Sequence, residues 1–189
     1  MKRLFFILIF LSLSFPASKA DAMVFISEIL ADPPAGLAGD ADGNGVRSSS
    51  GDEFVELYNK SDSTVDLTGW YLNDATGLRH VFSHTLQPQE YYPVFGSSAS
   101  TGSLGLNNTG DIVSLFDEEG ILRDRVVYGS IGNEDQSIVR EGNALFLHTQ
   151  ISPYAYSPGQ PNRPATVPQP ATFFLFLLGL SFCARFRPS

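Results

Sequence analysis

Cysteine is almost absent from this chain. Its 189 residues include one cysteine, Cys183, which lies inside an apolar run near the C-terminus. A disulfide needs two cysteines, so no intrachain disulfide can form. The region before that run must therefore be held together by its hydrophobic core rather than by covalent cross-links.

Positive charge is scarce between the two ends. Residues 23–168 hold seven of the twelve basic residues and nineteen of the twenty acidic ones, which gives them a formal charge of −12. A protein that binds the phosphate backbone of nucleic acid needs a basic face. The sequence therefore predicts no nucleic-acid partner, while its length suits one domain of ordinary size.

An apolar run opens the chain. Two basic residues precede it, it occupies residues 4–15, and small residues follow. This order is typical of a secretory signal peptide. We expect residues 1–22 to be removed by signal peptidase after Ala22 or, as the alternative, after Ala20. No cysteine stands directly after the run at the expected cleavage site, which excludes a lipoprotein anchor.

The C-terminus carries a second apolar run. Residues 163–170 are proline-rich and polar, as expected of a linker, and the 14 residues 171–184 are almost continuously apolar. As a helix they would span about 21 Å, less than the roughly 30 Å hydrocarbon core of a bilayer. Arg185 and Arg187 follow. Residues 171–189 are thus expected to form a short apolar helix with a basic tail, which contacts the membrane and leaves the preceding domain outside.

This arrangement resembles the PEP-CTERM sorting signal of Gram-negative bacteria. Val167, Pro168, Gln169 and Pro170 stand at its short motif, with Gln169 where the family usually has glutamate. The resemblance implies an exosortase as partner, removal of the apolar tail, and delivery to the cell surface, outer membrane or extracellular matrix. The alternative is a plain C-terminal membrane anchor.

Strand-forming residues dominate between the two ends. Short runs rich in Val, Ile, Phe and Tyr are separated by Gly, Asn, Asp and Pro, and no run indicates a helix longer than two turns. The expected strands are residues 24–30, 53–59, 65–73, 79–82, 91–95, 111–117, 121–128, 137–140 and 144–148. Without crossover helices, residues 23–162 are expected to form one all-β domain, an antiparallel β-sandwich.

Several of these segments resemble the lamin-tail domain. They are ISEIL at 26–30, DEFVELYN at 52–59 and VDLTGWYLND at 65–74, followed by LQP at 86–88, GDIVSL at 110–115, DRVVYG at 124–129 and SPGQPN at 157–162. The resemblance implies an immunoglobulin-like sandwich that acts as a recognition or structural module rather than as a catalyst. From the residues themselves, we expect Trp70 in the core and Asp66 and Asp74 as turn caps.

The segment DADGNG at residues 40–45 matches the first half of a calcium-binding loop. Every candidate ligand is a hard oxygen, which favours calcium over zinc. The twelfth position is Gly51 instead of glutamate, so Asp52 or Glu53 would have to substitute in a longer loop. The alternative is a loop that turns without metal. The predicted ligands are Asp40, Asp42, Asn44, the carbonyl of Val46, and Asp52.

No catalytic pattern stands out. Glu28, Glu53 and Glu56 lie near strand starts and could cluster, as a metal-dependent hydrolase of nuclease or phosphoesterase type would need. Glu53 and Glu56 are three apart on one strand, however, and should face opposite sides. We therefore predict a non-enzymatic, exported module that is stabilised by calcium and binds extracellular polysaccharide or another surface protein, with the secreted hydrolase as the alternative.

Overall fold

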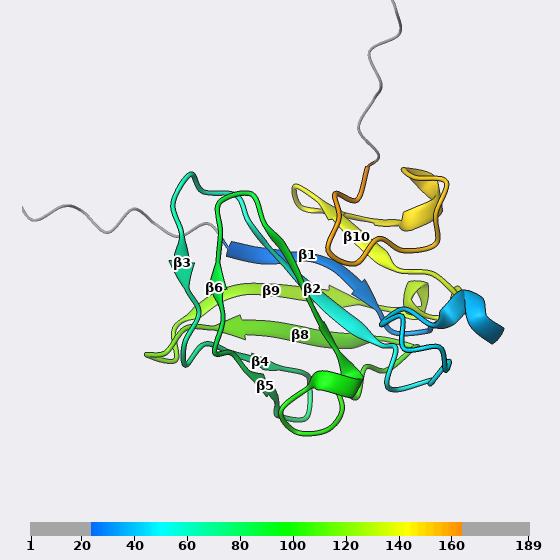
Figure 1. The fold of residues 1–189 in the computed structure, drawn as a ribbon, viewed down its shortest axis with the longest axis horizontal. Helices are drawn as coiled ribbons and strands as arrows, with labels where there is room; N and C mark the ends of the chain where they lie inside the picture. The colour runs from blue at the N-terminus through cyan, green and yellow to red at the C-terminus, as the bar shows by residue number, and fades with distance from the viewer. Residues whose placement is uncertain (1–23, 164–189) are drawn as a thin grey trace, which may run out of the picture.

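The computed structural model describes residues 24–163 and shows two antiparallel β-sheets packed face to face (Figure 1). The predicted signal peptide, the sorting motif and the C-terminal apolar helix lie outside the described residues. Within residues 24–163, no helix has both the length and the apolar character needed to cross a membrane. The prediction of an all-β antiparallel sandwich is confirmed.

The larger sheet has five strands in the order β11–β10–β1–β2–β7. Their bounds are β1 (Val24–Leu30), β2 (Phe54–Asn59), β7 (Tyr91–Phe95), β10 (Ile138–Glu141) and β11 (Ala144–Leu147). Strand β1 therefore lies in the middle of the sheet, although it begins the described chain.

The smaller sheet has four strands in the order β5–β4–β8–β9, and a two-stranded ribbon joins β3 to β6. The strands are β3 (Val65–Asp66), β4 (Tyr71–Asn73), β5 (Leu78–Val81), β6 (Thr85–Leu86), β8 (Asp111–Phe116) and β9 (Leu122–Tyr128). Four short 3₁₀ helices complete the described elements: η1 (Gly36–Gly39), η2 (Gly96–Ser98), η3 (Ser130–Gly132) and η4 (His148–Gln150).

The expected single strand over residues 65–73 is wrong. The segment divides into β3 and β4, which belong to different sheets. Between them, Gly69 adopts a φ of 83°, and the amide of Trp70 donates to the carbonyl of Leu67 at 2.9 Å. This turn needs the left-handed conformation that glycine tolerates, so the chain changes sheets there instead of continuing straight. Strand β6, only two residues long, was not predicted.

The hydrophobic core fills the space between the two sheets. Val55 and Leu57 contribute from β2, and Leu72 and Leu115 contribute from the facing sheet. Trp70 is 4% exposed and lies in this cluster, so its predicted place in the core is confirmed. Residues 55 and 57 point inward, and residues 54, 56 and 58 consequently point to the other face.

That second face, which we call the outer face of the larger sheet, carries three rows of residues paired across β1, β2 and β7. The rows are Leu30, Phe54 and Phe95; then Glu28, Glu56 and Pro93; then Phe25, Tyr58 and Tyr91. The final segment, residues 151–163, lies beside β1 and β10 and is drawn in orange in Figure 1. It covers the first two rows: Tyr156 packs on Phe54, and Gly159 bonds to Glu56.

The two sheets are also joined by a polar contact beside the core. A β-bulge interrupts the register of β1 between Ile26 and Glu28. The amide of Ile26 donates to the carboxylate of Asp124 on β9 at 2.8 Å. Arg140 on β10 pairs with the same carboxylate at 2.6 Å. Asp124 thereby satisfies a buried backbone donor of β1 next to the bulge.

We predict that Trp70→Ala lowers the free energy of unfolding by about 3–5 kcal/mol, because it leaves a large cavity between the sheets. Val127→Ala is the control, since Val127 is 58% exposed. It should change the free energy by less than about 0.5 kcal/mol. Urea unfolding of both variants measures the difference, and equal losses would contradict the place given to Trp70.

Candidate functional site

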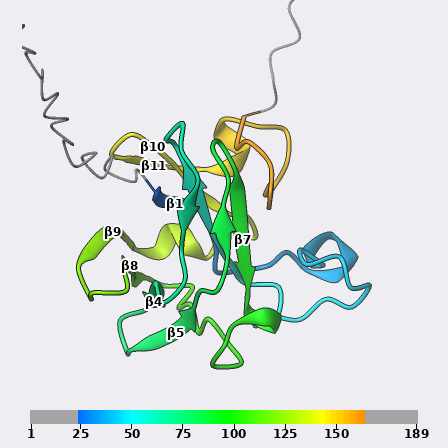
Figure 2. The ribbon, with the colours of Figure 1, turned by 60° about the vertical axis from the view of Figure 1, so that its left-hand side comes forward.

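The long connection between β1 and β2 gathers three aspartates. It projects from the sandwich and contains one short 3₁₀ helix, η1 (Figure 2). One carboxylate oxygen each from Asp40, Asp42 and Asp52 lie within 4.8 Å of one another. These are the three carboxylates that the sequence predicted as calcium ligands.

We call residues 40–52, which carry the three aspartates, the acidic loop. Asp52 organises this loop from its base. Its side chain is fully buried just before β2. One oxygen accepts the amide of Asp42 at 3.1 Å, and the other accepts the amide of Ser48 at 2.6 Å. Asp52 therefore brings both halves of the loop together without any metal.

The other two aspartates are held by hydrogen bonds. Asp40 accepts the amide of Gly45 at 2.9 Å through Oδ2, while its Oδ1 is buried and has no hydrogen-bond partner among the described residues. Asp42 accepts the hydroxyl of Ser97 at 2.8 Å and the amide of Asn44 at 3.0 Å. Burial opposes ionisation of Asp42, but these hydrogen bonds outweigh it and lower the pKa of the carboxyl.

The acidic loop has no compensating positive charge. Within residues 24–163, no basic side chain forms an ion pair with any of the three aspartates. Arg47 lies in the same connection but donates to the carbonyls of Pro33 and Pro34. Three close carboxylates repel one another, and a divalent cation would offset that repulsion. The donor set fits calcium.

The remaining predicted ligands are placed differently. The side-chain oxygen of Asn44 accepts the amide of Val46 at 2.8 Å, and its amide nitrogen donates to Asp42 at 2.9 Å. In this conformation Asn44 presents a donor, not an oxygen, to the aspartates. Glu53, the other candidate for the last position, points to the opposite side and accepts the amide of Leu106 at 3.2 Å.

A second polar cluster lies under the final segment. Glu28 on β1 and Glu56 on β2 stand directly opposite each other, and they are 1% and 0% exposed. Ser27 donates its hydroxyl to Glu56 at 2.7 Å, and the hydroxyl of Ser137 donates to Glu28. The structure thus brings together two of the three glutamates considered for a hydrolase. It places Glu53 on the other face, as its spacing predicted.

Burial makes this carboxyl pair hold protons. Loss of water and, to a smaller extent, the neighbouring charge of Glu28 together raise the pKa of Glu56 to about 8. Desolvation also raises the pKa of Glu28, although hydrogen bonds from Ser137 and the proximity of His148 work against it. Two like charges facing each other in a dry site cannot both form readily, so Glu56 is largely protonated at neutral pH.

The final segment is fastened to this pair. The amide of Ser157 donates to Glu28 at 3.0 Å, and the amide of Gly159 donates to Glu56 at 2.6 Å. Asn162 donates its side-chain amide to the carbonyl of Ser27 at 3.2 Å. We call these three contacts the C-terminal latch. They hold residues 157–162 on the outer face of the larger sheet.

His148 completes the latch and is fully buried. Its Nδ1 lies 2.8 Å from the carbonyl of Tyr154, so this nitrogen carries a proton and donates it. Its Nε2 lies 2.8 Å from the hydroxyl of Ser157 and 3.7 Å from Glu28. The arrangement binds one segment to another and leaves neither the histidine nor the carboxyl pair open to solvent.

Sequence reasoning did not find the latch. The sequence indicates Glu28 and Glu56 only as catalytic candidates, and it predicts no site at His148. SPGQPN at residues 157–162 was noted as part of a resemblance, and the spacing gave no partner for it. The sequence does contain one signal. Glu28 and Glu56 each lie among apolar residues of a strand, where a carboxylate exposed to water is not expected.

The hydrolase alternative gains no support from these positions. Among residues 24–163, the three aspartates of the acidic loop are the one group of His, Cys, Asp or Glu that brings three ligand atoms together. Each carboxyl oxygen of Glu28 and Glu56 accepts a hydrogen bond from the chain itself, and both residues lie beneath the final segment. They therefore offer no open coordination position to a metal or substrate.

Comparison with known proteins gives one family match. The model of the family described as Lamin Tail Domain matches residues 17–130. No curated protein matches the chain. The family match ends at the start of η3, whereas the structure continues the larger sheet through β10 and β11 and then into the latch.

We predict that Glu56→Gln makes stability less dependent on pH. A carboxyl whose pKa is raised in the folded state stabilises fully below its unfolded pKa, near 4.5, and loses that contribution as pH rises toward about 8. The wild-type protein should therefore lose up to about 1.4 kcal/mol per pH unit across this window relative to the glutamine variant.

Urea unfolding from pH 5 to 8 measures the difference between the two proteins. Glu118→Gln is the matched control, because Glu118 is exposed on the turn between β8 and β9. Its pH profile should follow that of the wild type. Parallel profiles for Glu56→Gln and the wild type would contradict the proton held by the buried pair.

Proposed function

Because the chain belongs to the lamin-tail domain family, we propose that it is an exported, non-catalytic module of the cell surface or extracellular matrix of a Gram-negative bacterium. Domains with this immunoglobulin-like fold typically lack catalysis. The observation that carries the proposal is the burial and hydrogen bonding of Glu28 and Glu56. The carboxylates that a hydrolase would need are buried, hydrogen-bonded and used to close the fold.

Export and sorting are supported by the sequence at the two ends. The segment 1–22 has the composition of a signal peptide cut after Ala22 or Ala20. Residues 167–170, the apolar run, and Arg185 and Arg187 after it have the order of an exosortase signal. Signal peptidase and an exosortase are therefore the proposed processing partners, and the membrane is contacted through the apolar segment before it is removed.

Binding, rather than turnover, is the proposed activity of the mature protein. Its charge of −12 over residues 23–168 disfavours nucleic acid, so the proposed partner is extracellular polysaccharide or another surface protein. A cysteine-free sandwich with a large buried core suits this setting, because it does not depend on the redox state outside the cell.

Calcium is the proposed stabilising ion of the acidic loop. The support is the convergence of Asp40, Asp42 and Asp52 within 4.8 Å, together with the buried and unpaired Oδ1 of Asp40. Those three residues would hold the ion, and Asn44 and the carbonyl of Val46 would join them only after a local rearrangement. The ion would order the connection before β2, since a connection of this length needs a reason to be ordered.

We expect millimolar calcium to raise the unfolding temperature of the wild-type protein relative to the protein in a chelator. At a concentration one hundred times the dissociation constant, the ion adds about 2.7 kcal/mol of stability. Asp42→Ala should abolish this effect. Asp62→Ala, which removes an exposed acidic side chain outside the acidic loop, should preserve it.

Calorimetric titration with calcium chloride checks the same proposal directly. The wild type and Asp62→Ala should release or absorb heat with one-site binding, and Asp42→Ala should not. An absence of calcium binding to the wild type would refute the calcium proposal and leave the rest of the proposed function in place.

Processing is tested by intact-protein mass spectrometry of the chain recovered from a producing bacterium that carries an exosortase. The mature form is expected to lack residues 1–22 and the apolar tail at 171–187. In a strain without the exosortase, the tail should be retained. A tail still present in the exosortase-bearing strain would refute sorting and favour the plain membrane anchor.

A further inference from the structure

One of the three rows on the outer face of the larger sheet stays partly open to solvent within residues 24–163. The C-terminal latch and Tyr156 cover the other two rows. The third row contains Phe25, Tyr58 and Tyr91, which stand directly opposite one another on three neighbouring strands. All three rings stay partly exposed when residues 24–163 are considered. Each is large and apolar, so a covering group would be favourable.

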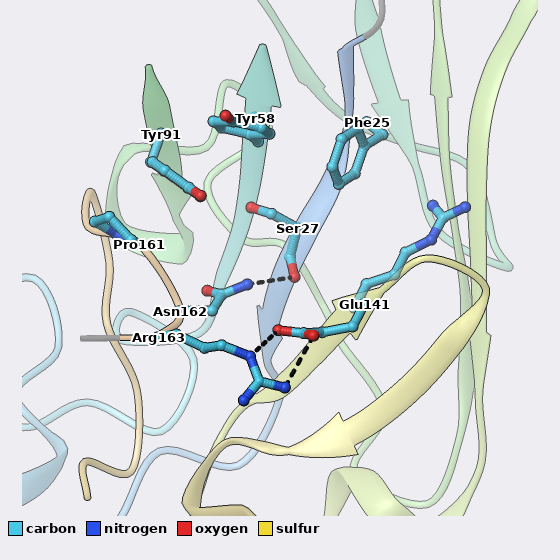
Figure 3. A pocket seen from close by; sticks show the side chains of 9 residues that line it. Phe25, Ser27, Tyr58, Tyr91, Glu141, Pro161, Asn162 and Arg163 are labelled. Carbon is cyan, nitrogen blue, oxygen red and sulfur yellow. Dashed lines mark hydrogen bonds and ion pairs between the residues drawn. The ribbon is translucent and has the colours of Figure 1, made fainter. Parts of the chain in front are cut away.

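A pocket of about 200 Å³ opens beside this aromatic row, between it and the end of the C-terminal latch (Figure 3). Ser27, which is 3% exposed, lies at its base, and the three aromatic side chains lie around it. Glu141 and Arg163 close the side opposite Tyr58. The pocket thus combines apolar rings with polar groups at its base and rim.

The aromatic walls are held in place before any ligand binds. Phe25 packs edge-on against Tyr58 with ring centroids 5.6 Å apart, and Tyr58 stacks on Tyr91 at 4.3 Å. The guanidinium of Arg140 lies 5.7 Å from the centre of the Phe25 ring and is itself fixed by Asp124. Rings fixed in this way lose little conformational entropy on binding, which favours recognition.

The polar rim has no net charge. Arg163 forms a two-point ion pair with Glu141 at 2.6 and 2.9 Å, and both side chains reach the solvent. Asn162 is held beside them through the carbonyl of Ser27. The hydroxyl of Tyr91 points into the space between these groups (Figure 3). The pocket therefore offers several donors and acceptors without a dominant charge.

We propose that this pocket binds one ring of a neutral polysaccharide. A pyranose has an apolar face of C–H groups that contacts aromatic rings, and hydroxyls around its edge that bond to paired polar side chains. A volume of about 200 Å³ is below the roughly 300–1,000 Å³ of pockets for larger ligands, and suits a single ring.

Charge selects between neutral and acidic polymers. Residues 23–168 carry a formal charge of −12, and both arginines that line the pocket are paired, Arg163 with Glu141 and Arg140 with Asp124. An acidic polymer would meet a repulsive surface there, whereas a neutral one would not. This inference rests on the proposed function, because it names the polymer class that the exported module would hold.

The test uses the full-length protein and four soluble probes: cellohexaose, laminarihexaose and maltohexaose as neutral chains, and hexagalacturonate as an acidic one. Saturation-transfer NMR should detect binding of at least one neutral probe and not of the acidic one. Tyr91→Ala should weaken that binding about tenfold, because it removes one aromatic wall. Tyr154→Ala, an exposed aromatic side chain that does not line the pocket, should leave it unchanged.

Failure of all three neutral probes to bind would overturn the proposal, and so would binding of hexagalacturonate alone or an unchanged affinity in Tyr91→Ala. Near-UV circular dichroism checks that each variant is folded. Tyr91→Leu, which keeps an apolar side chain without the ring, replaces the alanine variant if the latter is unfolded. A processed, exported protein that binds no probe would overturn the pocket alone, whereas an unexported protein would overturn the proposed function.

Discussion

The pairing of Glu28 with Glu56 is the constraint on which the rest of this sandwich depends. Two carboxyl groups face each other across the central strands, away from water, and burial favours their protonated forms. Such groups are tolerated only if their hydrogen-bonding capacity is satisfied. The backbone amides of Ser157 and Gly159 satisfy it, so the end of the described chain must return to its beginning.

The return of the chain organises the whole outer face of the larger sheet. Tyr156 packs on Phe54 and donates its hydroxyl to the carbonyl of Ala38 at 2.7 Å, which ties the final segment to the connection that carries the acidic loop. The segment then crosses the glutamate pair and ends at Arg163, beside the aromatic pocket. The acidic loop, the C-terminal latch and the pocket are thus successive parts of one surface, while the inner face is devoted to packing.

Local chemistry explains which parts of the fold were predictable. Strand β1 was predicted at its observed bounds because an apolar run with clear limits specifies it. Asp66 accepts the amide of Thr68 and Asp74 accepts those of Thr76 and Gly77, since short acidic side chains bond to the backbone that follows them. Strand β6 was not predicted, and β3 was predicted as one strand with β4. The reason is that strands of two residues have no periodicity to detect.

The amino-acid sequence by itself determined the elements that depend on neighbours along the chain: the fold class, most strands, the turn caps, and the aspartates that converge in the acidic loop. Only the tertiary structure decided the partners of residues far apart in sequence. Glu28 meets Ser157 across 129 positions, and the aromatic row forms from three separate strands. The physical reason is that a side chain's spacing defines the face it occupies, whereas what covers that face depends on how distant segments pack.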